Sequence, residues 1–378
     1  MDLSLDENQS AIVELARKIL EEKLPVERLR AIEASDEWFA RDVWAELAQA
    51  GLIGVALSED VGGGGFSEVE ACLLLEEIGR AVAPVPYLAT VLLGALPLNR
   101  FGSDEQRERD LPGVVAGEVV LTAALIEPGE AFVPARFATS AVRDGDGFRV
   151  DGEKWFVPFA SEARRILVPA RTDDGVVVLL VDPAAPGVCL ERVETTSFEP
   201  QWAVTLEDVR VGADGVLGDE ATGAHIVAWM VERALAGLCA MQAGVSDKAL
   251  RLTASHVSER EQFGQKIATF QAVAQRAADA FVDTQAILLT SRQAAWRLGS
   301  EKDATTELAI AKYWAADAGQ RVAHAAQHLH GGIGVDTDYP LHRYFRWTKM
   351  LELTLGGAAV QLDRIGQALA EGAASLDA

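Results

Sequence analysis

The spacing of apolar residues divides the chain into three stretches, and the first of them is helical. From Asp6 to about Gly117 apolar side chains recur once per helical turn. The clearest set, at i, i+3, i+4, i+7 and i+8, is Ile12, Leu15, Ala16, Ile19 and Leu20. A second amphipathic run spans Ala71 to Ala83, and the four glycines at 62–65 predict a loop between the two runs.

The middle stretch, from about Glu118 to Asp219, has the pattern of short strands. Runs rich in β-branched residues, such as Val176 to Val181, alternate with turn signals, such as the Asp-Gly-Asp-Gly sequence at 144–147. This stretch predicts a small, mostly antiparallel β-domain.

The third stretch, from about Ala221 to the C-terminus, is helical again. Its run from Ile267 to Leu298 contains no proline or glycine and has the length of a bundle helix. We therefore predict an α+β, multi-domain chain. It has an N-terminal helical domain at 1–117, a β-domain at 118–220 and a C-terminal helical bundle at 221–378.

Composition and charge narrow the possible functions. A net charge of −23 argues against nucleic acid as a partner, because its phosphates require basic patches. The apolar runs are too short to span a membrane, and the N-terminus lacks the pattern of a signal peptide. The widely spaced Cys72, Cys189 and Cys239 are expected to be small core residues in a reducing cytoplasm.

Common catalytic and metal-binding patterns are missing from the sequence. The six histidines have no metal-type spacing with carboxylates, so we expect no metal. No G-x-S-x-G motif or Cys/His dyad is evident.

Two segments have the residue types that bind a diphosphate. Gly331 and Gly332 would let backbone N–H groups approach phosphate oxygens closely, and Arg260 supplies a cation with several donors. Phe263, three residues after Arg260, is expected to share its helical face. The alternative is a Gly-Gly pair that caps a helix and an arginine on the surface.

Several motifs in sequence order resemble those of the acyl-CoA dehydrogenase family, over nearly the whole chain. They are Gly51 to Val55, Glu76 to Arg80, Arg260 to Gly264, and Gly331 to Gly334 followed by Tyr339-Pro340. Parts of the chain resemble an actinobacterial branch linked to steroid side-chain breakdown, in which some enzymes are two-plus-two heterotetramers. The resemblance implies the acyl-CoA dehydrogenase fold, FAD as cofactor and an acyl-CoA substrate. It also implies a homo- or heterotetramer and electron transfer to an electron-transferring flavoprotein.

In that family each FAD lies between two subunits, so the resemblance divides the site into two halves. The first, here called the diphosphate half, would hold the FAD of a neighbouring subunit. It comprises Arg260, Phe263, His328, Gly331 and Gly332, with His328 where a glutamine is usual.

The second, here called the ring half, would hold the flavin of the subunit's own site, and it is altered. Ile126 and Val157 stand where the family has hydroxyl residues, and only Trp155 remains as a wall for the ring. Each polar group left unpaired on a buried heterocycle costs about 1–3 kcal/mol. These losses predict weak flavin binding in this half, unless other groups rebuild the pocket.

The usual catalytic glutamate of the family is replaced by Leu355. One branch takes its base from an earlier helix, in a Leu-Glu-Arg context, and this chain has Val231-Glu232-Arg233 there. Glu232 is therefore a candidate base facing an apolar cavity, and Arg233 the substrate-side arginine beside it. The alternative is a solvated glutamate near a helix start.

Three functions remain open. One is FAD-dependent α,β-dehydrogenation of an acyl-CoA, bulky or branched and from lipid or steroid catabolism, with Glu232 as base. Another is a non-catalytic partner subunit that completes its neighbour's FAD site. The third is a DNA-binding relative, suggested by the mixed cations and aromatics from His342 to Lys349 and disfavoured by the net charge of −23.

Overall fold

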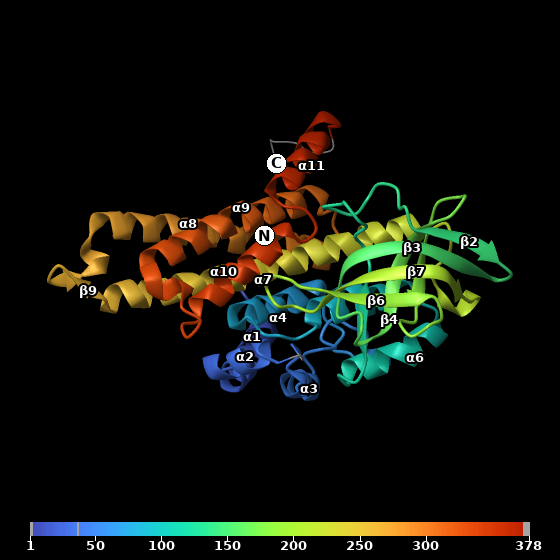
Figure 1. Ribbon diagram of the computed structural model, residues 1–378, viewed down its shortest axis with the longest axis horizontal. Coiled ribbons are helices and arrows are strands. Elements are labelled where there is room, and N and C mark those ends of the chain that lie inside the picture. Colours follow the sequence, from blue (N-terminus) through green and yellow to red (C-terminus); the bar gives the residue numbers. More distant parts are fainter. Residues whose placement is uncertain (1–2, 36–37, 373–378) are drawn as a thin grey trace. The chain divides into compact units, whose positions relative to one another are not determined.

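The computed structural model describes residues 3–35 and 38–372. The chain forms two compact units (Figure 1). The first contains Met1–Ser35, Glu68–Ala83 and Leu235–Ala378, and the second contains Asp36–Ser67 and Pro84–Ala234. Helix α7, Gly223–Glu259, runs through the division between them.

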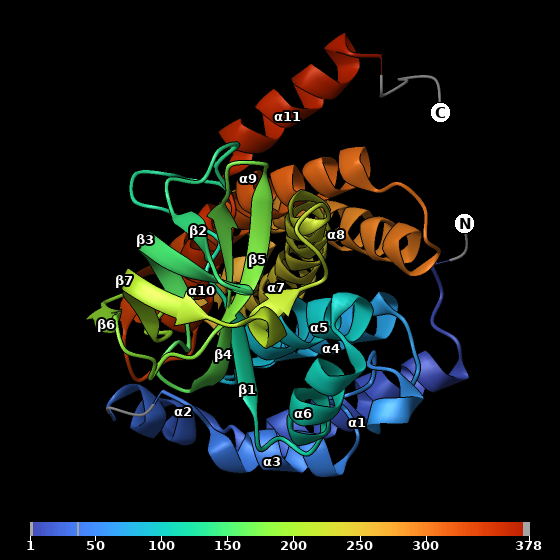
Figure 2. The same ribbon diagram turned by 90° about the vertical axis from the view of Figure 1, so that its right-hand side faces the viewer.

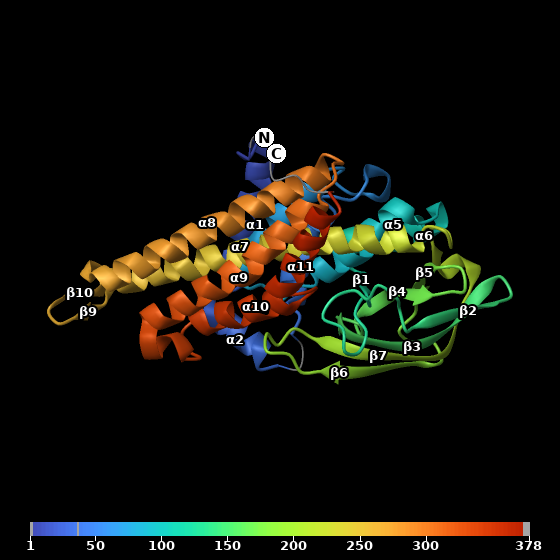
Figure 3. The ribbon, with the colours of Figure 1, turned by 90° about the horizontal axis from the view of Figure 1, so that it is seen from above.

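The first unit is helical. Besides the second part of α7, it contains α1 (Glu7–Lys23), α2 (Val26–Glu33), α4 (Glu68–Ala81), α8 (Gln271–Gly299), α9 (Thr305–His330), α10 (Leu341–Leu353) and α11 (Ala358–Ala370). Helix α9 packs against α8, α10 and α11 (Figure 3). The predicted bundle helix from Ile267 to Leu298 corresponds to α8, which a short 3₁₀ turn, Ile267–Thr269, precedes.

Helices α4 and α7 approach closely because glycines line their contact. A Cβ atom added to Gly79 would lie 2.1 Å from the carbonyl oxygen of Met241, and one added to Gly244 would lie 1.8 Å from that of Glu76. No side chain fits in such a space, so these glycines set the distance between the two helices.

A small hairpin follows α7. Strands β9 (Glu261–Gln262) and β10 (Gln265–Lys266) pair antiparallel at the end of this helix (Figure 3). Helix α9 ends at His330, and the residues that follow it form a 3₁₀ turn, Gly331–Val335, here called the glycine segment.

The second unit contains an eight-stranded sheet (Figure 2). Its strands run in the order β6-β7-β3-β2-β4-β5-β8, and β1 pairs with β4. Their bounds are β1 Val120–Ala123, β2 Ser140–Asp144, β3 Gly147–Pro158, β4 Ala163–Arg171, β5 Val176–Val181, β6 Val188–Val193, β7 Gln201–Val211 and β8 Val216–Leu217. The pairings of β1 and β2 with β4 are parallel and the others antiparallel, which confirms the mostly antiparallel prediction.

Short helices complete the second unit. They are α3 (Arg41–Gln49), α5 (Leu96–Phe101), α6 (Asp104–Val115), the π-helical segment Leu88–Ala95 and the 3₁₀ turns Glu59–Val61 and Ala213–Gly215. In β4 and β5, Ile166, Val168, Val177 and Leu179 are fully buried. Their continuous apolar runs reflect strands covered on both faces.

Two observations bear on the cellular setting. Helix α7 is long and apolar enough to cross a membrane by length and composition, but 72% of its most apolar window is buried inside the structure, as in a core helix. Cys72 and Cys239 are buried as expected, whereas Cys189 is exposed on β6, so its assignment to the core is wrong.

Candidate functional site

The diphosphate half lies within the first unit. Arg260 is exposed and directly follows α7, and its carbonyl accepts a hydrogen bond from the Ile267 N–H at 2.9 Å, which closes the hairpin. His328 is exposed in the last turn of α9, and Gly331 ends that helix.

The expectation that Arg260 and Phe263 share a helical face is wrong. Helix α7 ends at Glu259, and Phe263 occupies the hairpin turn, where Phe263 and Gly264 have φ values of 53° and 79°. Two successive positive φ angles are typical of a tight two-residue hairpin turn. The turn leaves Phe263 92% exposed, with its edge towards Phe270.

The glycine segment fits a diphosphate. Gly331 has a φ of 65°, and a Cβ atom added to Gly331 or Gly332 would meet nothing within 4 Å. Both residues are exposed, so a ligand can approach their backbone. Together with the Arg260 guanidinium, these groups match the donor set that the diphosphate of FAD requires.

Beneath the glycine segment lies a cluster that the sequence did not reveal. The His330 side chain is buried, and its Nδ1 lies 2.8 Å from the Ala326 carbonyl oxygen and its Nε2 3.0 Å from the Tyr339 hydroxyl. The His256 ring stacks on His330 with centroids 4.5 Å apart and an interplanar angle of 18°. The sequence offered one indication of this cluster, which is that His256 lies one helical turn before Arg260.

The ring half lies in the second unit, and a β-bulge shapes it. The Ile126 carbonyl accepts a hydrogen bond from the Trp155 N–H at 2.9 Å. The pairing of β3 with β7 shifts register between Lys154 and Val157, so one extra residue is accommodated there. Trp155 and Phe156 are both exposed, at 37% and 47%, and Val157 is fully buried.

This bulge changes which residues are available to a ligand. A regular strand would place Trp155 and Val157 on one face. Here Val157 points into the core and Phe156 is exposed beside Trp155, with their rings 5.7 Å apart and edge to face. Neither Ile126 nor Val157 offers a hydroxyl, so the side chains of the ring half do not fit the flavin as the family pattern would.

A buried ion pair supports the segment between Ile126 and β2. Lys154 Nζ donates to Glu127 Oε1 at 2.8 Å, and the amides of Ala138 and Thr139 donate to the same carboxylate. Burial lowers the pKa of Lys154 to about 8. Burial raises the pKa of Glu127, but hydrogen bonds, first that from Lys154, outweigh this and hold it below its ordinary value.

The candidate base lies on the first part of α7. The Glu232 carboxylate accepts a hydrogen bond from Arg233 Nη1 at 2.8 Å, and the Glu232 side chain is 31% exposed. Arg233 is buried, with its guanidinium 4.0 Å from the centre of the Trp229 ring. Glu232 is thus held by a cation and is partly exposed.

Leu355, at the usual position of the base, is buried in the first unit with a φ of 53°. Such a backbone conformation is strained for leucine and persists only when its surroundings enforce it. The Gln361 side-chain amide donates to the Leu355 carbonyl at 3.1 Å, and the Lys312 ammonium donates to the carbonyls of Leu351 and Glu352. The chain therefore keeps the backbone of this segment without its carboxylate.

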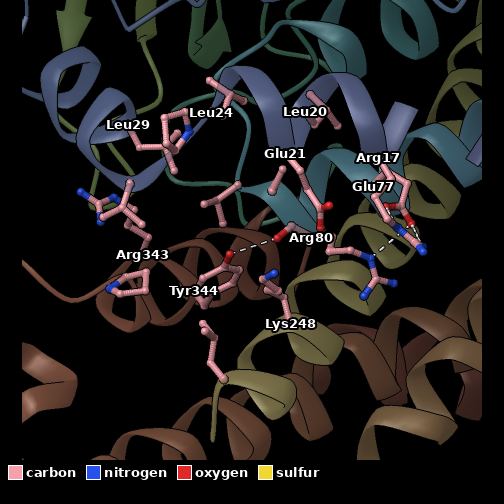
Figure 4. A pocket seen from close by; sticks show the side chains of 16 residues that line it. Arg17, Leu20, Glu21, Leu24, Leu29, Glu77, Arg80, Lys248, Arg343 and Tyr344 are labelled. Carbon is pink, nitrogen blue, oxygen red and sulfur yellow. Dashed lines mark hydrogen bonds and ion pairs between the residues drawn. The ribbon is translucent and has the colours of Figure 1, made fainter. Parts of the chain in front are cut away.

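A cavity of about 340 Å³ lies elsewhere in the first unit, among α1, α2, α4, α7 and α10 (Figure 4). It contains none of the predicted site residues. The three arginines that line it form ion pairs with carboxylates. Arg17 and Arg80 pair with Glu77, and Arg343 pairs with Glu33. We assign it no ligand.

Comparison with known proteins agrees with this fold. Family models described as the N-terminal, middle and C-terminal domains of acyl-CoA dehydrogenase match residues 6–118, 122–209 and 221–370. The chain belongs to the acyl-CoA dehydrogenase family, whose reaction is the FAD-dependent dehydrogenation of acyl-CoA thioesters.

Among its relatives, acyl-CoA dehydrogenase FadE27 of Mycobacterium tuberculosis is 38% identical over 98% of this chain and 99% of its own length. A variant of the Tcur3481-Tcur3483 steroid ACAD has a chain that is 44% identical, with a TM-score of 0.91 over 98% of this chain and 99% of that one. The ChsE4-ChsE5 complex from Mycobacterium tuberculosis has a chain that is 37% identical, with a TM-score of 0.93 over the same shares.

Proposed function

We propose that this chain is the partner subunit of a hetero-oligomeric acyl-CoA dehydrogenase and supplies the diphosphate half of its neighbour's FAD site. The observation that carries the proposal is the contrast between the two halves. Gly331 and Gly332 are open to a ligand beside the exposed Arg260, whereas Val157 of the ring half is buried.

The similar solved structures support a two-component assembly. Tcur3481-Tcur3483 and ChsE4-ChsE5 are each named for two proteins. Each of those structures contains a chain similar to this one over nearly its whole length. A heterotetramer of two copies of each subunit is the assembly that we propose for this chain.

In such an assembly this chain's residues bind and do not react. Arg260 and the amides of Gly331 and Gly332 would hold the diphosphate of FAD, and the exposed Phe263 would lie against its adenine. His328 would add a side-chain donor beside them. When bound, FAD accepts the hydride that the acyl-CoA loses at its β-carbon.

Several finer assignments belong to the same proposal. The substrate would be a bulky acyl-CoA from lipid or steroid catabolism, in line with the steroid ACAD among the similar structures. Electrons would pass to an electron-transferring flavoprotein, and the complex would act in the cytoplasm. We retain the three-domain division at 1–117, 118–220 and 221–378 as part of it.

A second candidate function is catalysis by this chain itself, with Glu232 as base and Arg233 beside it. It is favoured by the Glu232–Arg233 pair on α7, since the arginine fixes the carboxylate in one position. Against it stand Ile126 and Val157, which offer no hydroxyl to the flavin that a base in this chain would work with.

Turnover of the assembled complex separates the two candidates. Glu232→Gln keeps the size of the side chain and removes its basicity. If this chain is the partner subunit, the variant complex retains wild-type turnover of acyl-CoA. Loss of at least about a hundredfold in kcat, the usual contribution of a general base, would assign the base to Glu232 instead. Equal FAD content in both complexes shows that assembly is intact.

A further inference from the structure

The glycine segment rests on three residues that tie it to α7, here called the imidazole clamp. They are His256 near the end of α7, His330 at the end of α9, and Tyr339 before α10. His256 stacks on His330, and the carbonyl of His256 accepts from the Arg260 N–H at 2.9 Å. Because Gly331 directly follows His330, the clamp fixes the glycine segment relative to the start of the hairpin.

The hydrogen bonds of His330 define its tautomer. Its Nδ1 lies 2.8 Å from a carbonyl oxygen, which only accepts, so Nδ1 carries the proton. Its Nε2 then accepts from the Tyr339 hydroxyl at 3.0 Å. Neutral His330 thus uses both ring nitrogens. A proton added to Nε2 would reverse the hydrogen bond with Tyr339, whose hydroxyl would then have to accept, and it would place a charge against the stacked His256 ring, 4.5 Å away.

The charged surroundings disfavour protonation further. Burial and then the charge of Arg260 lower the pKa of His256, which nearby Glu259 only partly offsets. Burial lowers the pKa of His330 below its ordinary value, and the hydrogen bond to Ala326 opposes this less strongly. From the start of α10, His342 faces the same turn, and its Nδ1 lies 2.8 Å from the Tyr339 carbonyl oxygen.

We propose that the imidazole clamp positions Arg260, Gly331 and Gly332 for the adenosine diphosphate part of a dinucleotide, and that it holds only while both imidazoles are neutral. The identity of the ligand rests on the proposed function. His256, His330 and Tyr339 are therefore positioning residues, which act through the glycine segment and the hairpin without reacting.

The direction of the pH effect follows from the lowered pKa values. A histidine whose folded pKa lies below its ordinary value, about 6.5, favours the clamped state at higher pH. The contribution is complete above this ordinary value and is lost as the pH falls through the lowered values. A protonated His256 acting directly on the diphosphate would instead strengthen binding in acid, so the two explanations differ in sign.

Binding of ADP-ribose to the full-length chain measures this effect. Its diphosphate is esterified at both ends and does not titrate in the relevant range, so the protein sets the pH dependence. Calorimetry at about pH 7.5 and about pH 5.5 should show weaker binding in acid. Equal or tighter binding in acid would overturn the proposal.

Three variants isolate the clamp. His256→Phe keeps an aromatic ring on His330 and removes one titrating group, so it should bind like the wild type at neutral pH and lose less in acid. His256→Ala removes the ring contact and should weaken binding at both pH values by about three- to tenfold. His324→Gln, at an exposed position earlier on α9, is the matched control and should follow the wild type.

Two further outcomes would reject either the clamp alone or the diphosphate half together with it. If His256→Phe has the wild-type pH dependence, the clamp is not the titrating element, while the proposed function stands. If the wild-type chain binds no ADP-ribose at either pH, the diphosphate half itself is contradicted, and the clamp with it. Unchanged far-ultraviolet circular dichroism excludes unfolding as the cause of any loss.

Discussion

At the scale of single residues, the Glu127–Lys154 pair shows how the segment next to the ring half is held. Lys154 is fully buried, its Nζ lies 4.3 Å from the centre of the Phe137 ring, and Glu127 is 4% exposed. Both neighbours of this pair, Ile126 and Trp155, are predicted site residues, and a backbone hydrogen bond joins them. The positions of Ile126 and Trp155 therefore depend on a buried ion pair whose residues are not among the predicted site residues.

Replacing one member of this pair should destabilise the protein. Lys154→Met leaves the Glu127 carboxylate buried without its cation, which costs about 3–5 kcal/mol in the free energy of unfolding. Urea denaturation measures this cost.

The double variant Glu127→Gln/Lys154→Met is the matched control for that change. It removes both charges and keeps an acceptor for one of the two amides, Ala138 or Thr139, so it should recover part of the loss. A single variant as stable as the wild type would show that the pair contributes nothing to holding this segment.

At the scale of elements, the accuracy of the sequence predictions depended on whether the pattern was local. The strands around Val176 to Val181 and the helix after Ile267 follow from their spacing, and the structure contains β5 and α8 there. The placement of Phe263 and Val157 did not follow from the spacing of residues. Phe263 lies in a turn just after α7, and Val157 follows an extra residue in β3 relative to β7.

These two features share a physical cause. A bulge or a tight turn is set by what the partner strand or neighbouring helix requires, and no periodicity within the segment reveals it. The same holds for His256 and His330, which lie 74 positions apart by number and stack only because α7 and α9 end together.

The close contact of α4 and α7 gives a prediction at this scale. Gly79→Ala and Gly244→Ala place a methyl group against a backbone carbonyl, so the helices must separate, and each variant should lose about 1–3 kcal/mol of stability. Thermal unfolding followed by circular dichroism measures the loss.

A glycine on α11 provides the control for this pair. A Cβ atom added to Gly366 would meet nothing within 4 Å, so Gly366→Ala should leave stability unchanged or raise it by about 0.5–1 kcal/mol. If Gly79→Ala behaved like Gly366→Ala, the glycine contact would not set the distance between α4 and α7.

At the scale of the whole molecule, the predicted site residues fall into two groups, one in each compact unit. The first unit contains an open diphosphate half, and the second contains a ring half without hydroxyl side chains at Ile126 and Val157. The family motifs predicted the fold, and the roles of both sets of residues stay predictions. The motifs also showed that Leu355 replaces the usual glutamate, but not that its backbone would be strained.

The FAD content of purified protein tests the central claim most directly. Flavin absorbance per chain would be measured for this chain alone and for its complex with a co-expressed second acyl-CoA dehydrogenase subunit. The account predicts little FAD on the chain alone and one FAD per pair of unlike chains in the complex, with Arg260→Gln in this chain lowering that content. One FAD per subunit in a sample of this chain alone would contradict it.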